Sequence, residues 1–241
     1  ERLEQAFEMQ GRFVADASHE MRTPLATMRT NLEVLQLDPK ATLSDYKEMS
    51  VTLTRTLDRL ERLSNDLLLL ARGELEVHKV PVNIEALLTE VVQNLMPFAK
   101  ENHVIINMKV QEGAVVLADE RLLGIAFGNL IDNGIRYNRS GGSVEITVFG
   151  VDNGLTVQIQ DTGEGIPSEE LPRIFDRFYR VEKSRTRYRG GAGLGLAICE
   201  HIIKLHGGHI KASSTVGEGS NFIIWLPSIA STSFDPVLTE S

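Results

Sequence analysis

The chain has 241 residues, 42% of them apolar, and a net charge of −8, so it can build one large domain or two modest ones. The acidic balance argues against nucleic-acid binding. The single cysteine, Cys199, excludes an internal disulfide framework and fits a reducing compartment. No stretch approaches the roughly 18 apolar residues that span a bilayer, and no signal-peptide pattern is present. Because the chain starts inside a charged helical pattern, we expect it to be a piece of something longer.

An amphipathic helix is predicted over residues 1–37. Apolar residues recur there every seventh position in two interleaved rows, namely Phe7, Val14, Met21, Met28 and Leu35, and Leu3, Ala17, Leu25 and Leu32. Pro39 ends this pattern because proline cannot continue the hydrogen-bond ladder. On the helical wheel His19 falls on the outer face, beside Glu20 and one turn before Thr23. A solvent-facing imidazole in that position is available for chemistry.

A second helix is predicted from Ser44, as its N-cap, to Gly73. Its apolar residues again lie seven apart, at Tyr46, Leu53, Leu60 and Leu67. Two helices joined by a short turn form an antiparallel hairpin over residues 1–72. A single hairpin buries its apolar stripe poorly, whereas two hairpins packed as a four-helix bundle bury it well. We therefore expect a homodimer.

Residues 73–80 read as a linker to a second domain over residues 81–228, followed by a polar tail, 229–241, that we expect to be disordered. The pattern predicts these elements: helices near 83–99, 119–137 and 193–206, and strands near 103–110, 114–118, 143–150, 154–160, 209–214 and 219–226. The overall fold class is therefore α+β, with the helices of the second domain on one face of a mixed sheet. Cys199 and Trp225 are expected in its core.

Asn129 and Asn133 lie four residues apart on a predicted helix, so both amides project from one face. An amide oxygen is a reasonable Mg²⁺ ligand when substrate phosphates supply most of the others. Taken alone, the pair is more typical of a solvated polar face. Arg136 and Tyr137, one turn further on, could offer a charge to a phosphate and a ring to a base.

Two glycine-containing segments follow. Asp161, at the end of a predicted strand, could accept a hydrogen bond from an exocyclic amine, and Gly163 and Gly165 before Ile166 would let a ligand approach the backbone; a plain turn is the alternative. The second segment opens a predicted helix, where free N–H groups form an anion site suited to a triphosphate; a flexible loop is the alternative. Its residues include Gly191, Gly193, Leu194 and Gly195.

The connection between these two segments, residues 163–192, is long and irregular, as functional lids often are. Apolar residues could anchor it, and basic residues give it positive charge; a disordered insertion is the alternative. The apolar anchors are Phe175, Phe178 and Tyr179, and the basic residues are Arg180, Lys183, Arg185 and Arg187.

In this order and spacing, the motifs resemble the core of a two-component sensor histidine kinase. The similar segments are Ser18–Leu25 (phosphoacceptor box), Asn129–Tyr137 (N box), Asp161–Ile166 (first glycine box), Phe175–Arg180 (F box) and Gly191–Leu196 (second glycine box). Five motifs in register are far more specific than any one of them. The resemblance covers residues 1–228 and implies an α/β-sandwich ATP-binding domain.

The resemblance also implies roles for single residues. His19 would accept the γ-phosphoryl group of ATP, with Glu20 as its acid–base partner. Asn133, with Asn129, would hold Mg²⁺ and the triphosphate, and Asp161 would read adenine. Thr23 would orient the water that removes phosphate from a partner aspartate.

The implied function is an ATP-dependent histidine autokinase that passes its phosphoryl group to an aspartate of a response regulator, and that also acts as a phosphatase. The implied location is cytoplasmic, with membrane attachment only through segments absent from this chain. Two alternatives are an ATP-driven conformational clamp without phosphotransfer and a non-catalytic dimeric scaffold. Neither alternative explains both the outward-facing His19 and the intact nucleotide motifs.

Overall fold

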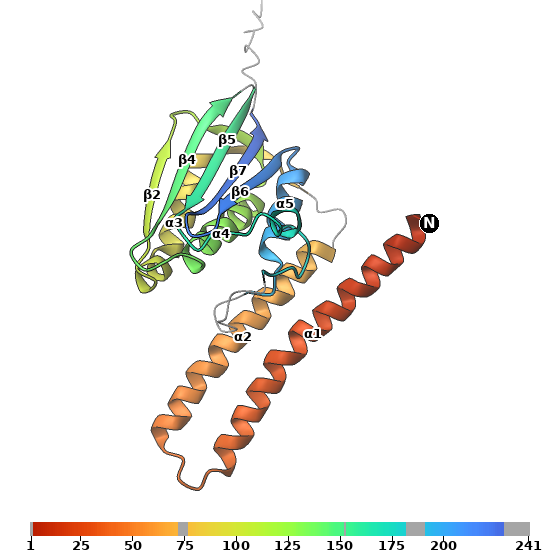
Figure 1. Cartoon of the computed structure of the whole chain (residues 1–241), viewed down its shortest axis with the longest axis vertical. Coiled ribbons are helices and arrows are strands. Elements are labelled where there is room, and N and C mark those ends of the chain that lie inside the picture. The colour runs from red at the N-terminus through yellow and green to blue at the C-terminus, as the bar shows by residue number, and fades with distance from the viewer. Residues whose placement is uncertain (1, 72–76, 152, 182–190, 229–241) are drawn as a thin grey trace, which may run out of the picture. The chain divides into compact units, whose positions relative to one another are not determined.

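In a computed structural model the chain forms two compact units, residues 1–75 and 76–241, shown in Figure 1. The structure describes residues 2–71, 77–151, 153–181 and 191–228. The predicted tail at 229–241 and the basic side chains between 182 and 190 lie outside these residues.

The first unit is a helical hairpin, as the heptad pattern predicts. Helix α1 runs from Arg2 to Leu37 without interruption at Pro24, and α2 runs from Leu43 to Ala71. The predicted N-cap of α2 is wrong by two residues. Thr42, not Ser44, caps the helix: its Oγ1 accepts a hydrogen bond from the Asp45 N–H at 3.4 Å, and the Asp45 carboxylate accepts from the Thr42 N–H at 2.7 Å. This reciprocal pair is a capping box.

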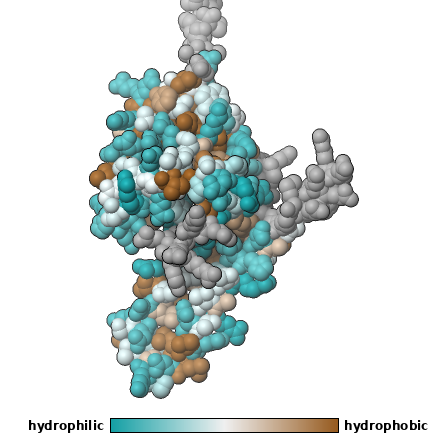
Figure 2. All heavy atoms as spheres, in the orientation of Figure 1, coloured by the Kyte–Doolittle hydropathy of each residue, from teal (hydrophilic) through white to brown (hydrophobic). Residues whose placement is uncertain are grey.

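The apolar side chains of the hairpin fall into two groups, one half-buried and one exposed. Met21, Met28 and Leu35 are half-buried, while Val14, Leu25 and Leu32 stay 57%, 52% and 37% exposed. The three exposed residues fall within about 20° of one another around α1, because 11 and 7 residues are near whole numbers of turns. Figure 2 shows hydrophobic surface on this unit as well, toward the turn between its helices. A stripe of exposed apolar residues thus runs along the hairpin. The side chains of Leu3 and Phe7 lie outside the described part.

The second unit is a sheet covered on one face by helices (Figure 1). Its five strands are ordered β2-β4-β5-β7-β6, with β2 and β4 parallel and the other pairs antiparallel. Their bounds are β2 Ile105–Val110, β4 Ser143–Val151, β5 Gly154–Asp161, β6 His209–Thr215 and β7 Gly219–Pro227. The helices are α3 Ile84–Glu101, α4 Glu120–Arg136 and α5 Gly195–Leu205, with a short 3-10 turn η1 at Leu171–Arg173. The predicted α+β class is confirmed.

A second, two-stranded sheet was missed by the sequence analysis. Strand β1, Val80–Asn83, pairs antiparallel with β3, Val115–Ala118. The expected linker therefore already enters a strand at Val80. Asn83 ends that strand and caps α3, since its Oδ1 accepts from the Ala86 N–H at 3.0 Å.

The core lies between the helices and the inner face of the sheet. Alternate strand residues such as Val144, Ile146 and Val157 are at most 1% exposed, because successive side chains point to opposite faces. Cys199, on α5, is fully buried as expected. Trp225 is not in this core. It lies half-exposed on the open face of the sheet, over Gly154 and stacked on His209 with ring centroids 5.3 Å apart.

Candidate nucleotide-binding site and phosphoacceptor helix

Helix α4 has one buried face and one polar face. Its apolar residues, from Leu122 to Ile135, are buried against the sheet and the other helices. Asn129, Asn133 and Arg136 are half-buried and fall on the other face, three to four residues apart. The structure therefore brings the predicted polar residues of this helix together in one row.

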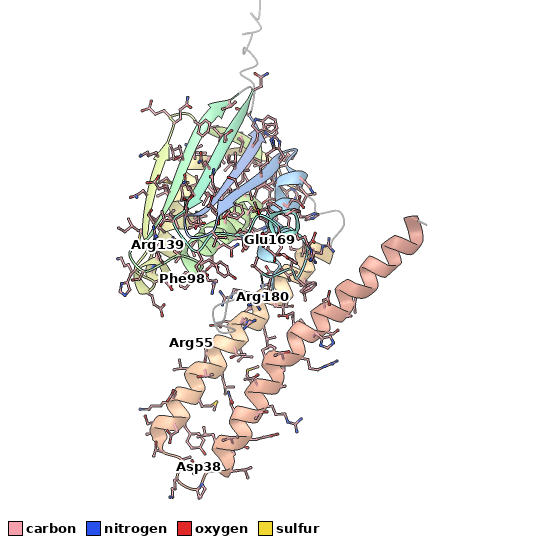
Figure 3. The ribbon with its side chains drawn as sticks, viewed as in Figure 1. Asp38, Arg55, Phe98, Arg139, Glu169 and Arg180 are labelled. Atoms are coloured by element: carbon pink, nitrogen blue, oxygen red, sulfur yellow. The ribbon has the colours of Figure 1, made fainter. Side chains whose placement is uncertain are left out.

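The guanidinium of Arg136 is already engaged within this row. It pairs with the carboxylate of Asp132, with Nε–Oδ2 at 3.0 Å and Nη2–Oδ1 at 2.9 Å, and its Cζ lies 5.0 Å from the centroid of the Phe98 ring. Phe98, on α3, lies at the same end of this unit as Arg139, which follows α4 (Figure 3). The sequence analysis singled out neither Asp132 nor Phe98, although an i,i+4 acid–base spacing could have indicated the ion pair. A phosphate contact of Arg136 stays a prediction.

Asp161 is the last residue of β5 and is 7% exposed. Its Oδ1 accepts hydrogen bonds from the backbone N–H groups of Gly163 at 2.8 Å and Ser220 at 3.3 Å. Burial raises the pKa of this carboxyl above its ordinary value, against the opposing effect of those hydrogen bonds. A carboxylate placed in this way can accept a hydrogen bond from an amino group of a ligand.

The loop after Asp161 is held on two sides. On one side, the Glu164 N–H donates to the carbonyl of Tyr137, at the end of α4, at 3.0 Å. On the other, the Ile166 N–H donates to Ser214 Oγ at 2.7 Å, and Gly165, at φ +71°, lies against the backbone of Thr215. A side chain at Gly165 would collide with that strand, so both the conformation and the space require glycine.

Asn138 and Thr162 join the same loop to the start of β4. Asn138 Nδ2 donates to the carbonyls of Gly134 and Ser143, each at 2.9 Å, and Thr162 Oγ1 accepts from the Ser143 N–H at 2.9 Å. Asn138 is 8% exposed. The sequence analysis assigned no role to either residue, and the Thr162 bond to Ser143 spans 19 positions.

The second glycine segment is fixed by the segment around Phe178. Gly193 and Phe178 both have left-handed backbone conformations, with φ +74° and +63°, and the Phe178 N–H donates to the Gly193 carbonyl at 2.9 Å. Leu194 is buried, and α5 starts at Gly195, two residues later than predicted. Asn129 Nδ2 reaches the Gly195 carbonyl at 3.3 Å. The two predicted motifs thus meet across α4 and α5.

Arg180 borders a hollow of about 460 Å³ beside this segment. The other lining residues are Glu169, Glu170, Arg173 and Tyr179; Figure 3 labels Glu169 and Arg180 on the connection between β5 and α5. Arg173 lies over the Tyr179 ring, with its Cζ 4.2 Å from the centroid. The part of the connection that is described is therefore ordered by contacts of its own.

The asparagine amide oxygens on α4 suit a magnesium ion that is also coordinated by nucleotide phosphates. Asn129 uses its amide nitrogen on Gly195, which leaves its oxygen as an acceptor, and Asn133 is half-buried one turn away. No group of three or more His, Cys, Asp or Glu side chains within the described ranges could hold a metal ion. Phosphate oxygens would therefore have to complete the coordination.

On the helical unit, the structure places His19 on the exposed outer face of α1, as predicted, with Glu20 half-buried beside it. Thr23 Oγ1 donates to the His19 carbonyl at 3.2 Å. Pro24 follows within the same helix. The imidazole is therefore accessible while its backbone is held in a regular helix.

Comparison with known proteins assigns both units. Residues 9–76 match the His Kinase A (phospho-acceptor) domain, and residues 118–229 match the histidine kinase-, DNA gyrase B-, and HSP90-like ATPase. The chain belongs to the sensor histidine kinases. The second unit of this kinase core is accordingly an ATP-binding domain.

Relatives extend the match over both domains of the kinase core. This chain is 36% identical over 228 residues to the sensor histidine kinase RppB of Synechocystis, covering 92% of this chain and 50% of that protein. It is 34% identical over 230 residues to the signal transduction histidine-protein kinase BaeS of Escherichia coli, covering 93% and 48%. The chain thus spans about half the length of these relatives. No helix of the described ranges is long and apolar enough to cross a membrane.

A solved structure agrees with this fold. Full-length ShkA in complex with AMPPNP matches 90% of this chain and 45% of its own, with a TM-score of 0.67 and 28% identity. The mixed sheet with helices on one face and the preceding helical hairpin are therefore the architecture of this family.

Proposed function

We propose that this chain is an autokinase that transfers the γ-phosphoryl group of ATP to His19. The carrying observation is that His19 is exposed on a phosphoacceptor helix, while in a separate domain Asn129 of α4 bonds to Gly195 and Asp161 lies against Gly134 of the same helix. In the transfer, a bond forms between a ring nitrogen of His19 and phosphorus. The bond between phosphorus and the bridging oxygen breaks, and ADP leaves.

Each residue contributes binding or proton control. Asp161 accepts a hydrogen bond from the adenine amino group, and the loop with Gly163, Gly165 and Ile166 contacts the base and ribose. Asn133 and Asn129 hold the Mg²⁺ ion, which neutralises phosphate charge, and Tyr137 and Arg136 border the nucleotide. Glu20 fixes the tautomer of His19, so that one ring nitrogen is free to attack.

The N-terminus of α5 receives the phosphates. Its free N–H groups point toward a ligand, and an anion there is stabilised by the helix dipole. Gly191, Gly193, Leu194 and Gly195 supply these groups, with Phe178 and Arg180 on the adjoining segment. The reacting groups lie in different units, so the linker predicted at residues 73–80 must let them meet. Catalysis is then mainly positioning and charge neutralisation.

The test is incubation with γ-labelled ATP and Mg²⁺. We expect label that is acid-labile and alkali-stable, as phosphohistidine is, and expect it to vanish in His19→Gln. His209→Gln, an exposed histidine on β6, is the matched control and should keep the label. Label that survives in His19→Gln would reject His19 as the acceptor.

We propose a homodimer through the hairpin and an aspartate of a response-regulator receiver domain as the second acceptor. The exposed stripe of Val14, Leu25 and Leu32 supports the first, and membership of a two-component family supports the second. Regulator dephosphorylation through Thr23 belongs to the same proposal, and unchanged dephosphorylation in Thr23→Ala would remove it. The clamp alternative leaves the exposed His19 without a role.

A further inference from the structure

His206 is a buried histidine that belongs to none of the motifs named above. It caps the C-terminus of α5 and is 2% exposed. Its Nδ1 lies 2.8 Å from the Ile202 carbonyl, and its Nε2 lies 2.9 Å from the backbone N–H of Asp119. Because Nδ1 meets an acceptor and Nε2 meets a donor, the ring is neutral with its proton on Nδ1.

The partner of His206 is the residue that starts α4. Asp119 is the N-cap of this helix, and its Oδ1 accepts from the Leu122 N–H at 3.0 Å. Its Oδ2 accepts from the N–H of His78, near the entry of the chain into this unit, at 3.3 Å. The start of α4, the end of α5 and the segment before β1 therefore meet at one point.

Helices α4 and α5 are joined a second time where Asn129, in the middle of α4, donates to Gly195, the first residue of α5, at 3.3 Å. Ten residues separate Asp119 from Asn129 on α4, which is about 15 Å of helix, and eleven separate Gly195 from His206, about 16.5 Å. The two antiparallel spans match in length. A hydrogen bond at each end thus fixes where the N-terminus of α5 lies along α4.

We propose that His206 is a positioning residue for nucleotide binding, because its bond to Asp119 sets the N-terminus of α5 against Asn129. This inference rests on the proposed ATP site but not on phosphoryl transfer to His19. When the bond is lost, α5 can shift along α4, and the glycine segment no longer meets the amides of α4 in the arrangement that receives a triphosphate.

Protonation gives the His206–Asp119 hydrogen bond a pH dependence that a purely packing role for His206 would lack. Burial lowers the pKa of His206, the charge of Lys79 lowers it further, and the Ile202 carbonyl and the Asp119 carboxylate oppose them. A proton on Nε2 replaces the acceptor with a donor and leaves the Asp119 N–H without its partner. Nucleotide affinity should therefore fall as pH drops through the lowered pKa of His206.

The experiment measures AMPPNP binding with Mg²⁺ by calorimetry on the full chain between pH 5.5 and 8. His206→Gln places an amide oxygen near the position of Nε2, which accepts from Asp119 but does not titrate. His206→Phe keeps a planar aromatic ring and removes both bonds. His209→Gln is the control for an exposed histidine, and thermal unfolding confirms that each variant is folded at the temperature used.

We expect His206→Phe to bind AMPPNP about fivefold more weakly at pH 8, the size of one lost hydrogen bond. We expect His206→Gln to bind like the wild type at pH 8, and better than it once the pH is low enough to protonate His206. The ratio of the two affinities cancels the titration of the nucleotide itself. Wild-type affinity in a folded His206→Phe, or binding by His206→Gln as weak as that of His206→Phe at pH 8, would overturn the proposal. Absence of phosphohistidine label on the wild-type chain, with normal AMPPNP binding, would count against the autokinase proposal alone.

Discussion

The side-chain amide of Asn129, in the middle of α4, donates a hydrogen bond to the backbone carbonyl of Gly195, the first residue of α5, at 3.3 Å. The two residues lie 66 positions apart in the chain. This contact joins the polar row of α4 to the glycine segment that begins α5. This hydrogen bond therefore positions the two sides of the proposed phosphate site relative to each other.

Gly193→Ala should weaken ATP binding and destabilise the second unit by about 1–3 kcal/mol. Gly193 has φ +74°, and an added Cβ would lie 2.7 Å from the Tyr179 carbonyl oxygen. Gly150→Ala, on β4, is the control, because its added Cβ would lie no closer than 3.8 Å to a neighbouring atom and its φ is not left-handed. Thermal unfolding and nucleotide calorimetry measure both effects, and equal behaviour of the two variants would contradict the argument.

Asp161→Asn should lower ATP affinity about tenfold or more, because a hydrogen bond to a carboxylate is stronger than one to a neutral amide. The nucleotide-free variant should not unfold at a lower temperature than the wild type. The amide oxygen can still accept from Gly163 and Ser220, and no charge is buried. Calorimetry and thermal denaturation check the two halves of this prediction separately.

The same substitution should change how stability depends on pH. The pKa of Asp161 is raised by burial, so its protonated form favours the folded state, and this contribution is lost as pH rises through the folded pKa. The unfolding temperature of Asp161→Asn minus that of the wild type should therefore increase from about pH 4 toward pH 7. A difference that shrinks over this range would contradict the assigned cause.

Thr42→Ala should destabilise the helical hairpin by about 1 kcal/mol, whereas Ser44→Ala should have little effect. Thr42 makes the capping box with Asp45, and the hydrogen bonds from Thr42 hold the pKa of the Asp45 carboxyl below its ordinary value. Denaturation of the hairpin monitored by circular dichroism compares the two variants. A larger loss of stability in Ser44→Ala than in Thr42→Ala would show that Ser44 is the cap.

Leu25→Glu combined with Leu32→Glu should dissociate the proposed dimer, because both exposed side chains would lie in the interface. Val51→Glu is the matched control: Val51 is 52% exposed on α2 but falls about 140° around that helix from the exposed Tyr46. Sedimentation velocity measures the mass of each variant. A dimer that persists in the double variant would place the interface elsewhere.

The sequence by itself determined the features that depend on local spacing. The heptad rows of α1 predict a helix whose outer face carries His19, and that side chain is exposed. The i,i+4 spacing of Asn129 and Asn133 correctly puts both on one face of α4. Both follow from the fixed period of a helix.

Only the tertiary structure decided the contacts between distant segments. The Asp119 and His206 hydrogen bond spans 87 positions, and that of Ile166 with Ser214 spans 48. No periodicity relates such residues, so their pairing depends on how the helices and the β6–β7 hairpin pack. Trp225 was wrongly expected in the core for the same reason: composition indicates that tryptophan is usually buried, but only the strand register decides which face of the sheet it occupies.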